Sequence, residues 1–256
     1  MPELVPHVLA DRAEGVLTLT IDRPEKKNAL TRDMYLALAE ALNAVNKEPE
    51  IAVVVLRGAG GVFTAGNDLR DFQARAANPD DKEPSGGMLL LQALSSCEAV
   101  LVGSVSGLAI GIGTTGLLHC DFVYAGRSAR FRTPFVDLGL SVEGASSLLL
   151  PQIIGYRAAA EMLLECQEID ADRAKQLGLV NAVFPDVDLE ANVAEEARCL
   201  AAKPRTALRT AKRMLLEAKR PAVAAAIDRE YVAFADCLRS PEAQAIFQKF
   251  FEKTPE

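Results

Sequence analysis

The sequence is poor in the residues that most often carry metal and hydrolase chemistry. Its 256 residues include two histidines, His7 and His119, and five cysteines without C-x-x-C spacing. A zinc site needs such ligands at short spacing, and a disulfide framework normally needs an even number of cysteines. Ser146 and Ser147 have no partner histidine in a recognisable arrangement, and we interpret His119 as a packed residue rather than a base. We therefore expect neither a metal site nor serine hydrolysis.

Long runs of one charge and long apolar runs are missing too. The net charge is -7 and the basic residues are dispersed, which argues against a nucleic-acid partner. No stretch reaches the roughly 18 apolar residues of a membrane span, and the first residues lack the basic and apolar segments of a signal peptide. The final Thr-Pro-Glu is not a peroxisomal address. We expect a cytoplasmic protein with no membrane partner.

The apolar pattern that is present predicts an α/β fold. Alternating or near-continuous apolar runs predict strands at residues 15–24, 51–60, 99–107 and 121–126. Residues 28–49 have helical spacing, with Thr31 as a possible cap. Strands separated by helical stretches favour parallel pairing. From about residue 185 the pattern is helical almost throughout, and its apolar residues would serve either the core or a subunit interface: Phe234, Ile246, Phe247, Phe250 and Phe251.

Residues 111–116, GIGTTG, satisfy the G-x-G-x-x-G pattern of dinucleotide-binding folds. Such a fold needs a crossover helix of several turns after the glycines, but the strand-like segment at 121–126 begins too soon. Two interpretations remain. The glycines would allow close packing, or the turn would expose backbone N–H groups at a helix N-terminus, as in an oxyanion hole. The turn at Ala65, Gly66 and Asn67 is the candidate for the second donor.

Four segments together carry a resemblance to a known family. They read LTIDRPEKKNAL (19–30), FTAGNDL (63–69), VSGLAIGIGTTGLLHCDFVYAGRSARFRTPFVDLGL (105–140) and AKQLGLVNAVFP (174–185). In order and spacing they resemble the crotonase, or enoyl-CoA hydratase/isomerase, family over nearly the whole chain. The resemblance implies an α/β fold with a ββα superhelix (spiral) core and acyl-CoA site in residues 1–196, and a helical C-terminal oligomerisation region in residues 197–256.

The resemblance also implies a ligand and a site. The substrate would be an acyl-CoA, with no separate cofactor because coenzyme A is part of it, and the assembly a homotrimer or a dimer of trimers. A thioester enolate would be stabilised by the backbone N–H groups of Asn67 and Ile112. Lys26 or Lys27 would meet a phosphate or be a solvated lysine. The substrate-binding residues it implies are Lys27, Ala29, Ala65, Gly66, Asp68, Leu69, Gly111 and Phe135.

The acidic residues point to a reaction. Hydratases of this family use two glutamates, and the matching positions here are Thr115 and Phe135, which puts efficient hydration in doubt. The pattern TPF-x-x-LG-x-S-x-EG-x-SS is similar to the delta-3,delta-2-enoyl-CoA isomerase branch, in which the glutamate matching Glu143 is the catalytic base. From its local pattern alone, Glu143 is equally well a helix-start acid, and Asp137 a turn acid or a substitute base.

The sequence therefore predicts an enzyme that moves a double bond of an enoyl-CoA from the 3 to the 2 position. Apolar neighbours would raise the pKa of Glu143 and a helix dipole would lower it, and the sequence leaves that balance open. Enoyl-CoA hydration or another enolate reaction on the same fold is the alternative. A weakly active acyl-CoA-binding protein is a further one.

Overall fold

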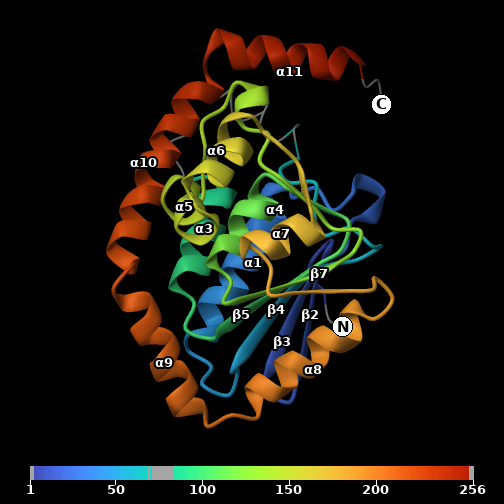
Figure 1. The fold of residues 1–256 in the computed structure, drawn as a ribbon, viewed down its shortest axis with the longest axis vertical. Coiled ribbons are helices and arrows are strands. Elements are labelled where there is room, and N and C mark those ends of the chain that lie inside the picture. Colours follow the sequence, from blue (N-terminus) through green and yellow to red (C-terminus); the bar gives the residue numbers. More distant parts are fainter. Residues whose placement is uncertain (1–2, 69, 71–83, 254–256) are drawn as a thin grey trace.

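The computed structural model describes residues 3–68, 70 and 84–253 (Figure 1). Its strands are β1 (Glu3–Val5), β2 (Val8–Ala13), β3 (Val16–Ile21), β4 (Val53–Gly58), β5 (Val100–Val105), β6 (Leu108–Ile110), β7 (Phe122–Gly126), β8 (Arg130–Arg132), β9 (Ile169–Asp170) and β10 (Ala182–Phe184). Its α-helices are α1 (Arg32–Val45), α3 (Gly86–Ser96), α4 (Ile112–Thr115), α5 (Ser146–Ile154), α6 (Tyr156–Leu164), α7 (Ala171–Leu177), α8 (Leu189–Ala201), α9 (Arg205–Glu217), α10 (Arg220–Leu238) and α11 (Pro241–Lys253). Short 3-10 helices are η1 (Pro24–Lys26), η2 (Gly116–His119) and η3 (Val136–Leu138).

The larger sheet has the strand order β1-β2-β3-β4-β5-β7-β10. Strands β3, β4, β5, β7 and β10 pair in parallel, and β1 and β2 add an antiparallel edge. The strands predicted from apolar patterning are confirmed, and so is parallel pairing. The helix expected at 28–49 is shorter, because it starts after the N-cap Thr31 and ends at Val45; the Thr31 side chain makes no cap bond.

A second, smaller layer is formed by the segments that follow the strands of the larger sheet. Strands β6, β8 and β9 form a three-stranded sheet, and Thr64 bridges Ala109 of β6 while Leu30 bridges Asn67. Each of β3, β4, β5 and β7 is thus followed by a segment of the second layer. This repeat is the predicted ββα superhelix. Its consequence for the site is that the segments after β4 and β5 lie side by side.

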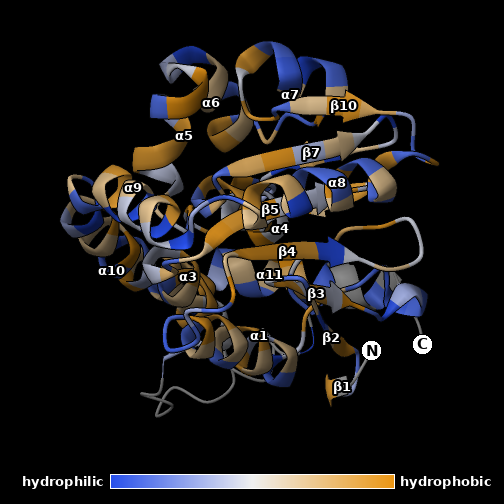
Figure 2. Ribbon diagram, turned by 90° about the horizontal axis from the view of Figure 1, so that it is seen from below, coloured by the Kyte–Doolittle hydropathy of each residue, from blue (hydrophilic) through white to orange (hydrophobic). Residues whose placement is uncertain are grey.

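Helices cover both faces of the large sheet, which explains why its central strands β4 and β5 are largely apolar and buried on both faces (Figure 2). Alternate side chains point to opposite faces. On one face, Leu17 and Leu19 belong to the main core cluster with α1 and α3. On the other face, Val53 and Val55 pack in a second cluster with Val193 of α8.

The C-terminal helices wrap around this core. Helices α9 and α10 run along one side and α11 crosses one end (Figure 1). The predicted boundary after residue 196 falls inside α8, so that helix is shared between the two parts, and the division stays a prediction. Phe234 and Phe247 pack with Phe135 in a third apolar cluster. The side chains of Phe250 and Phe251 lie outside the described part of the structure. Among the described helices, none has both the length and the apolar composition to cross a bilayer.

Candidate active site

The first candidate donor lies in the segment between β4 and residue 68. The N–H of Leu30 donates to Gly66 O at 2.8 Å and the N–H of Asp68 donates to Leu30 O at 2.9 Å. This pairing holds Asn67 between two fixed residues. The Asn67 N–H itself donates no hydrogen bond to another described residue. Tyr35 Oη of α1 donates to Asn67 Oδ1 at 2.7 Å, which fixes the side chain and leaves the backbone N–H available.

A buried asparagine fastens the preceding loop to this segment. Asn28 adopts a left-handed conformation (φ 58°), which asparagine tolerates better than most residues. Its Nδ2 donates to Ala59 O (2.9 Å) and Val62 O (2.6 Å), and its O accepts from Thr64 Oγ1 (2.7 Å). The loop from residue 24 to residue 30 is therefore held against the strand end that leads to Asn67.

Asp68 joins the same loop through an ion pair. Arg23 Nη1 lies 2.8 Å from Asp68 Oδ2 and also donates to Ala29 O at 3.1 Å. Partial burial opposes charge on Asp68, but the hydrogen bonds from Arg23 and from the Arg70 N–H win and lower the pKa of this carboxyl. Asp68 therefore stays charged and ties the loop to the donor segment.

The second candidate donor follows β6. Gly111 has φ 58° and ψ -121°, a conformation that strongly favours glycine, and it turns the chain from β6 into α4. Its carbonyl accepts from the N–H groups of Thr114 and Thr115, whereas the Ile112 N–H donates no hydrogen bond within the described part of the chain. The helix expected here is short, because α4 ends at Thr115 and continues as η2.

The two donor segments touch. A Cβ built on Gly66, which has φ 90°, would lie 2.7 Å from Ile110 O, and one built on Gly113 would lie 2.5 Å from Thr64 Cγ2. Only glycine allows the backbones to approach so closely. The Asn67 and Ile112 N–H groups thus belong to neighbouring segments of the second layer.

Glu143 lies in the turn before α5 and is partly buried. Thr115 Oγ1 donates a short hydrogen bond to Glu143 Oε1. Burial raises the pKa of Glu143 to about 7, against the lowering effect of the Thr115 bond, and the negative charge of Glu230 adds to the rise. Burial therefore outweighs the hydrogen bond from Thr115. A carboxyl with a pKa of about 7 can both take up and release a proton near neutral pH.

His119 supports the turn that carries Glu143. Its ring is buried, and its Nε2 lies 2.9 Å from Gly144 O. Because a carbonyl only accepts, Nε2 carries the hydrogen. Burial lowers the pKa of His119 to about 4, so the ring is neutral at working pH. His119 is thus a buried, packed residue, as interpreted from the sequence, with a structural hydrogen bond.

Phe135 precedes η3 and lies beside the second donor turn, and Asp137 is on η3. Phe135 is buried, a Cβ at Gly111 would lie 3.7 Å from its Cε1, and its ring meets Phe234 of α10 edge-on with centroids 6.1 Å apart. Asp137 is half-exposed, with 51% of its side chain accessible, and pairs with Arg132 Nη2 at 2.6 Å. The apolar ring of Phe135 therefore lies beside the donor turn, whereas the carboxylate of Asp137 is paired with Arg132.

Comparison with known proteins identifies the family to which this chain belongs. A family model described as enoyl-CoA hydratase/isomerase matches residues 11–256. The chain belongs to this family.

Relatives of this crotonase-family protein carry different activities in their names. Human enoyl-CoA delta isomerase 2 is 35% identical over 211 residues, which are 81% of this chain and 53% of the human protein, so the chain spans about half of that relative. A crotonyl-CoA hydratase from Syntrophomonas wolfei is 28% identical over 248 residues, 96% of this chain and 95% of that protein. The crystal structure of an enoyl-CoA hydratase/isomerase from Pseudoalteromonas atlantica T6c superimposes with a TM-score of 0.90 at 41% identity, covering 98% and 99% of the two chains. The predicted fold is confirmed, whereas family membership alone does not select the reaction.

The remaining predicted substrate contacts of this crotonase-family chain lie on the loop before α1 and beside Asn67. Lys26 and Lys27 are exposed, and Lys27 O accepts from the Ala65 N–H at 2.9 Å. Ala29 and Ala65 are partly buried on adjoining segments. Leu69 lies outside the described residues. Across residues 3–68, 70 and 84–253, no group of three His, Cys, Asp or Glu side chains is placed to hold a metal ion.

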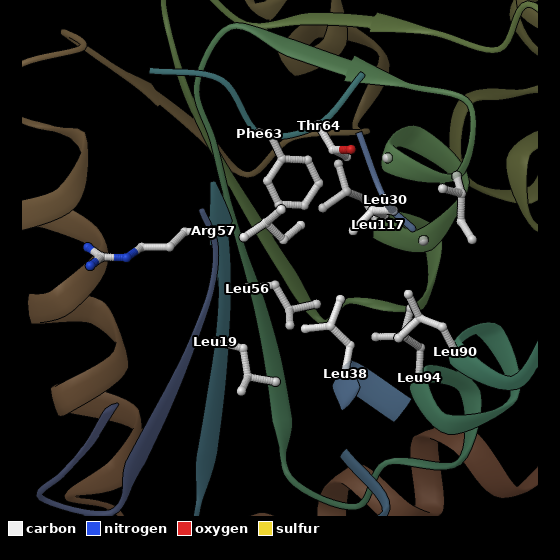
Figure 3. A pocket seen from close by; sticks show the side chains of 14 residues that line it. Leu19, Leu30, Leu38, Leu56, Arg57, Phe63, Thr64, Leu90, Leu94 and Leu117 are labelled. Carbon is white, nitrogen blue, oxygen red and sulfur yellow. The ribbon is translucent and has the colours of Figure 1, made fainter. Parts of the chain in front are cut away.

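An apolar cavity lies behind the second donor turn, between the sheet, α1 and α3 (Figure 3). Its volume is about 40 Å³, and Ile112, Gly113 and Leu117 are among its lining residues. Arg57 is at its edge but extends away from the leucines, and it pairs with Glu190 of α8 (Figure 3). Such a lining keeps water out. Ile112 lines the cavity but Asn67 and Glu143 do not, so the cavity is part of the apolar core beneath the candidate site.

Sequence reasoning missed several residues that build the site. Tyr35 and Asn28 position the first donor segment, and Glu230 adds a charge near Glu143. Thr115 was named from the sequence as standing at a hydratase glutamate position, but its hydrogen bond to Glu143 was not predicted. A signal for Glu230 was present in the sequence. Val223, Ala226 and Ile227 form one apolar face of α10, and Glu230 occupies the next position of that face, three residues after Ile227.

Proposed function

We propose that this protein is an enoyl-CoA isomerase that moves a double bond from the 3 to the 2 position. The carboxylate of Glu143 removes a proton from C2 of a 3-enoyl thioester. The C–H electron pair forms a C1–C2 double bond and the carbonyl π electrons move onto the thioester oxygen, which gives a dienolate that keeps the C3–C4 double bond. When C4 is protonated, the oxygen re-forms the carbonyl, the C1–C2 pair becomes the C2–C3 double bond and the C3–C4 pair binds the proton. The same carboxyl then returns the proton to C4, so that no atom is gained or lost.

The observation that carries the proposal is the single carboxyl of Glu143, with a pKa near 7, next to a threonine at one hydratase glutamate position. A group that must accept and then give back one proton works best when its pKa is near the working pH. Because the other hydratase position is the buried Phe135, no second carboxylate is available there to activate water. One carboxyl suffices for isomerisation.

Backbone donors would stabilise the dienolate. The N–H groups of Asn67 and Ile112 have no competing acceptor in the described part of the chain, and both sit on segments fixed by hydrogen bonds. Such preorganised donors are typically worth on the order of 10²–10³ in rate each. Buried apolar side chains would also limit attack of water on the conjugated product: Leu91 lies beside Gly144, the residue after Glu143, and Phe135 lies beside Gly111.

The substrate class and the assembly are proposed on the same basis. The loop at Lys27 and Ala29 and the segment at Ala65, Asp68 and Leu69 are proposed to bind coenzyme A. A homotrimer, or a dimer of trimers, agrees with large apolar side chains that α9 and α10 leave exposed, at 66% for Met214, 73% for Leu215 and 59% for Val232. Light scattering after size-exclusion chromatography tests this: a monomer at all concentrations contradicts it.

An assay with two substrates tests the reaction. Incubation with a 3-enoyl-CoA is expected to raise the absorbance of the conjugated thioester, and incubation with a 2-enoyl-CoA is expected to leave that absorbance nearly unchanged. Glu143→Gln should abolish the rise. If the 3-enoyl-CoA does not react and the 2-enoyl-CoA is hydrated in a reaction that requires Glu143, the isomerase proposal is wrong.

Hydration is the second candidate, because the similarity to a crotonyl-CoA hydratase covers almost the full length of both proteins. In that case Glu143 and Asp137 would act together, one on water and one on the α-carbon. The pairing of Asp137 with Arg132 in a half-exposed position disfavours this role. An acyl-CoA-binding protein with little activity is the third candidate, and unchanged turnover in Glu143→Ala would favour it.

A further inference from the structure

Glu230 is a buried acid on α10 that reaches the turn carrying Glu143. Its side chain is 3% exposed, on the face of α10 that packs toward the core. Glu230 Oε1 accepts from the Ser147 N–H at 3.0 Å and also from Ser147 Oγ. Ser147 is the second residue of α5, so a carboxylate from another helix caps the N-terminus of α5.

The turn before α5 needs such anchors. Gly144 has φ 76° and Ala145 has φ 58°, so two successive residues are left-handed and the second of them has a Cβ. A conformation of this kind persists only where the surroundings hold it. His119 Nε2 binds Gly144 O before the strained alanine, and Glu230 binds Ser147 after it. The position of Glu143 thus depends on anchors on both sides of Ala145.

Stability alone does not explain a glutamate at this place. Glu230 Oε2 and the neighbouring Ser146 Oγ are buried without a hydrogen-bond partner in the described structure. A buried carboxylate with one unpaired oxygen is unfavourable compared with an apolar side chain of similar size. The other buried residues on this face of α10 are apolar, so packing alone would favour an apolar residue at position 230. Glu230 is therefore a candidate for a functional role.

We propose that Glu230 is a positioning residue, which holds the turn that carries Glu143 and places a second carboxylate within electrostatic range of it. The proposal rests on the proposed function only in taking Glu143 as the base. Its action is indirect, because Glu230 bonds to Ser147 and not to Glu143.

The charges around Glu143 make the electrostatic part specific. Helices α3 and α5 contain no charged residue, and His119 of η2 is neutral. Asp228 and Arg229, next to Glu230 on α10, are exposed, and Lys212 and Lys219 act on His119. Among the described residues, Glu230 is a charged group that acts on Glu143, and its like charge adds to the larger effect of burial in raising the pKa of Glu143. Removing that charge should lower the pKa of Glu143.

The test compares Glu230→Gln, which keeps an oxygen for Ser147 but removes the charge, with Ser147→Ala, which keeps the charge but removes one anchor. Infrared spectra of protein labelled with ¹³C in the glutamate carboxyls are titrated without substrate, and Glu143→Gln identifies the Glu143 band. In Glu230→Gln the Glu143 midpoint should move to lower pH by about half a unit or more. In Ser147→Ala the midpoint should stay, and isomerase kcat should fall about 3- to 10-fold.

An unchanged midpoint in Glu230→Gln overturns the electrostatic part, and an unchanged kcat in Ser147→Ala overturns the positioning part. A helix cap that neither acts on the charge of Glu143 nor positions its turn would change neither the midpoint nor kcat. If Glu230→Gln does not fold, Ser147→Ala and Glu230→Asp test the positioning role. Glu230→Asp keeps the charge, but its shorter side chain cannot reach Ser147, so kcat should fall. The titration needs no substrate, so the two proposals can fail separately. If the protein has no isomerase activity but the Glu143 midpoint still shifts in Glu230→Gln, the proposed function is wrong and the effect of Glu230 on Glu143 stands.

Discussion

The two halves of the candidate site are built in different ways. The donor half consists of backbone N–H groups at Asn67 and Ile112, held by bridges between neighbouring segments and by glycines that let them touch. The acid half is one side chain, Glu143, held by a threonine of α4 and by a turn that depends on η2 and α10.

This difference shows how each half depends on the rest of the molecule. The donors follow from the superhelix itself, because each strand of the large sheet delivers a segment to the second layer beside its predecessor. The properties of the acid come from packing of helices far apart in the sequence. The donor half should therefore be sensitive to added volume, and the acid half to changes of charge.

Removal of the acid should have the largest effect. Glu143→Gln keeps the size and the ability to accept from Thr115 but cannot take up a proton, so kcat for isomerisation should fall by about 10²–10⁴. The measurement is the initial rate with a 3-enoyl-CoA, with circular dichroism as a control for folding. A variant that keeps more than a tenth of the activity would show that another group is the base.

Added volume between the donor segments should come next. A methyl group at Gly113 would overlap Thr64 Cγ2, whereas one at Gly116 would meet Leu94 Cδ1 at an ordinary 3.5 Å. Gly113→Ala should displace the Thr64 segment and lower kcat on the order of 10²-fold, since a shift of about 1 Å can have that effect. Gly116→Ala is the matched control and should stay within about twofold of the native rate. Equal rates for both variants would contradict the close-contact account.

Ionisation of Glu143 should weaken the fold as pH rises. The folded pKa of about 7 lies above the ordinary value of 4.5, so between these pH values the folded chain binds more protons than the unfolded chain. Stability therefore falls as pH rises from 4.5 to 7 and then levels off. Glu143→Gln should be more stable than the native protein at pH 8 by on the order of 2 kcal/mol, allowing for partial exposure, and nearly equal to it at pH 4.5. Denaturant titrations at both pH values measure this; a gap that does not widen with pH would refute it.

Loss of the Tyr35 hydroxyl should have a moderate effect. Tyr35→Phe removes the bond to Asn67 Oδ1 and frees that side chain, so kcat/KM should fall about 2- to 10-fold. Tyr124→Phe is the control, because Tyr124 is also buried but packs in the cluster with α8 on the other face of the sheet. Its rate should match the native one, and a larger loss there than in Tyr35→Phe would mean that general destabilisation is being measured.

The smallest effect is expected at the other acid. Asp137→Asn removes the charge from an ion pair with Arg132 in which both side chains are about half accessible, and such an exposed pair contributes little to stability. Isomerisation should stay within about twofold of the native rate. A loss comparable to that of Glu143→Gln would place Asp137 in the chemistry and favour the hydratase alternative.

The parts that could be predicted from the sequence are those set by local pattern. Apolar runs gave the parallel strands, and the glycines at 66 and 111 marked both turns, because such conformations restrict the residue type. The resemblance identified Glu143, but its pKa could not be predicted from the sequence. Burial raises this pKa and the Thr115 hydrogen bond lowers it, and both depend on the folded structure. The apolar face of α10 marked Glu230 as an acid in a buried position, but its partner could not be predicted, because its contact with Ser147 joins residues 83 positions apart.

A crystal structure with a saturated acyl-CoA bound tests the central claim most directly, because this thioester carries the reacting carbonyl but cannot isomerise. We predict a thioester oxygen within about 3 Å of both the Asn67 and the Ile112 nitrogen, and C2 facing the carboxyl of Glu143. A thioester oxygen that contacts neither nitrogen, or a Glu143 carboxyl turned away from C2, would contradict the account.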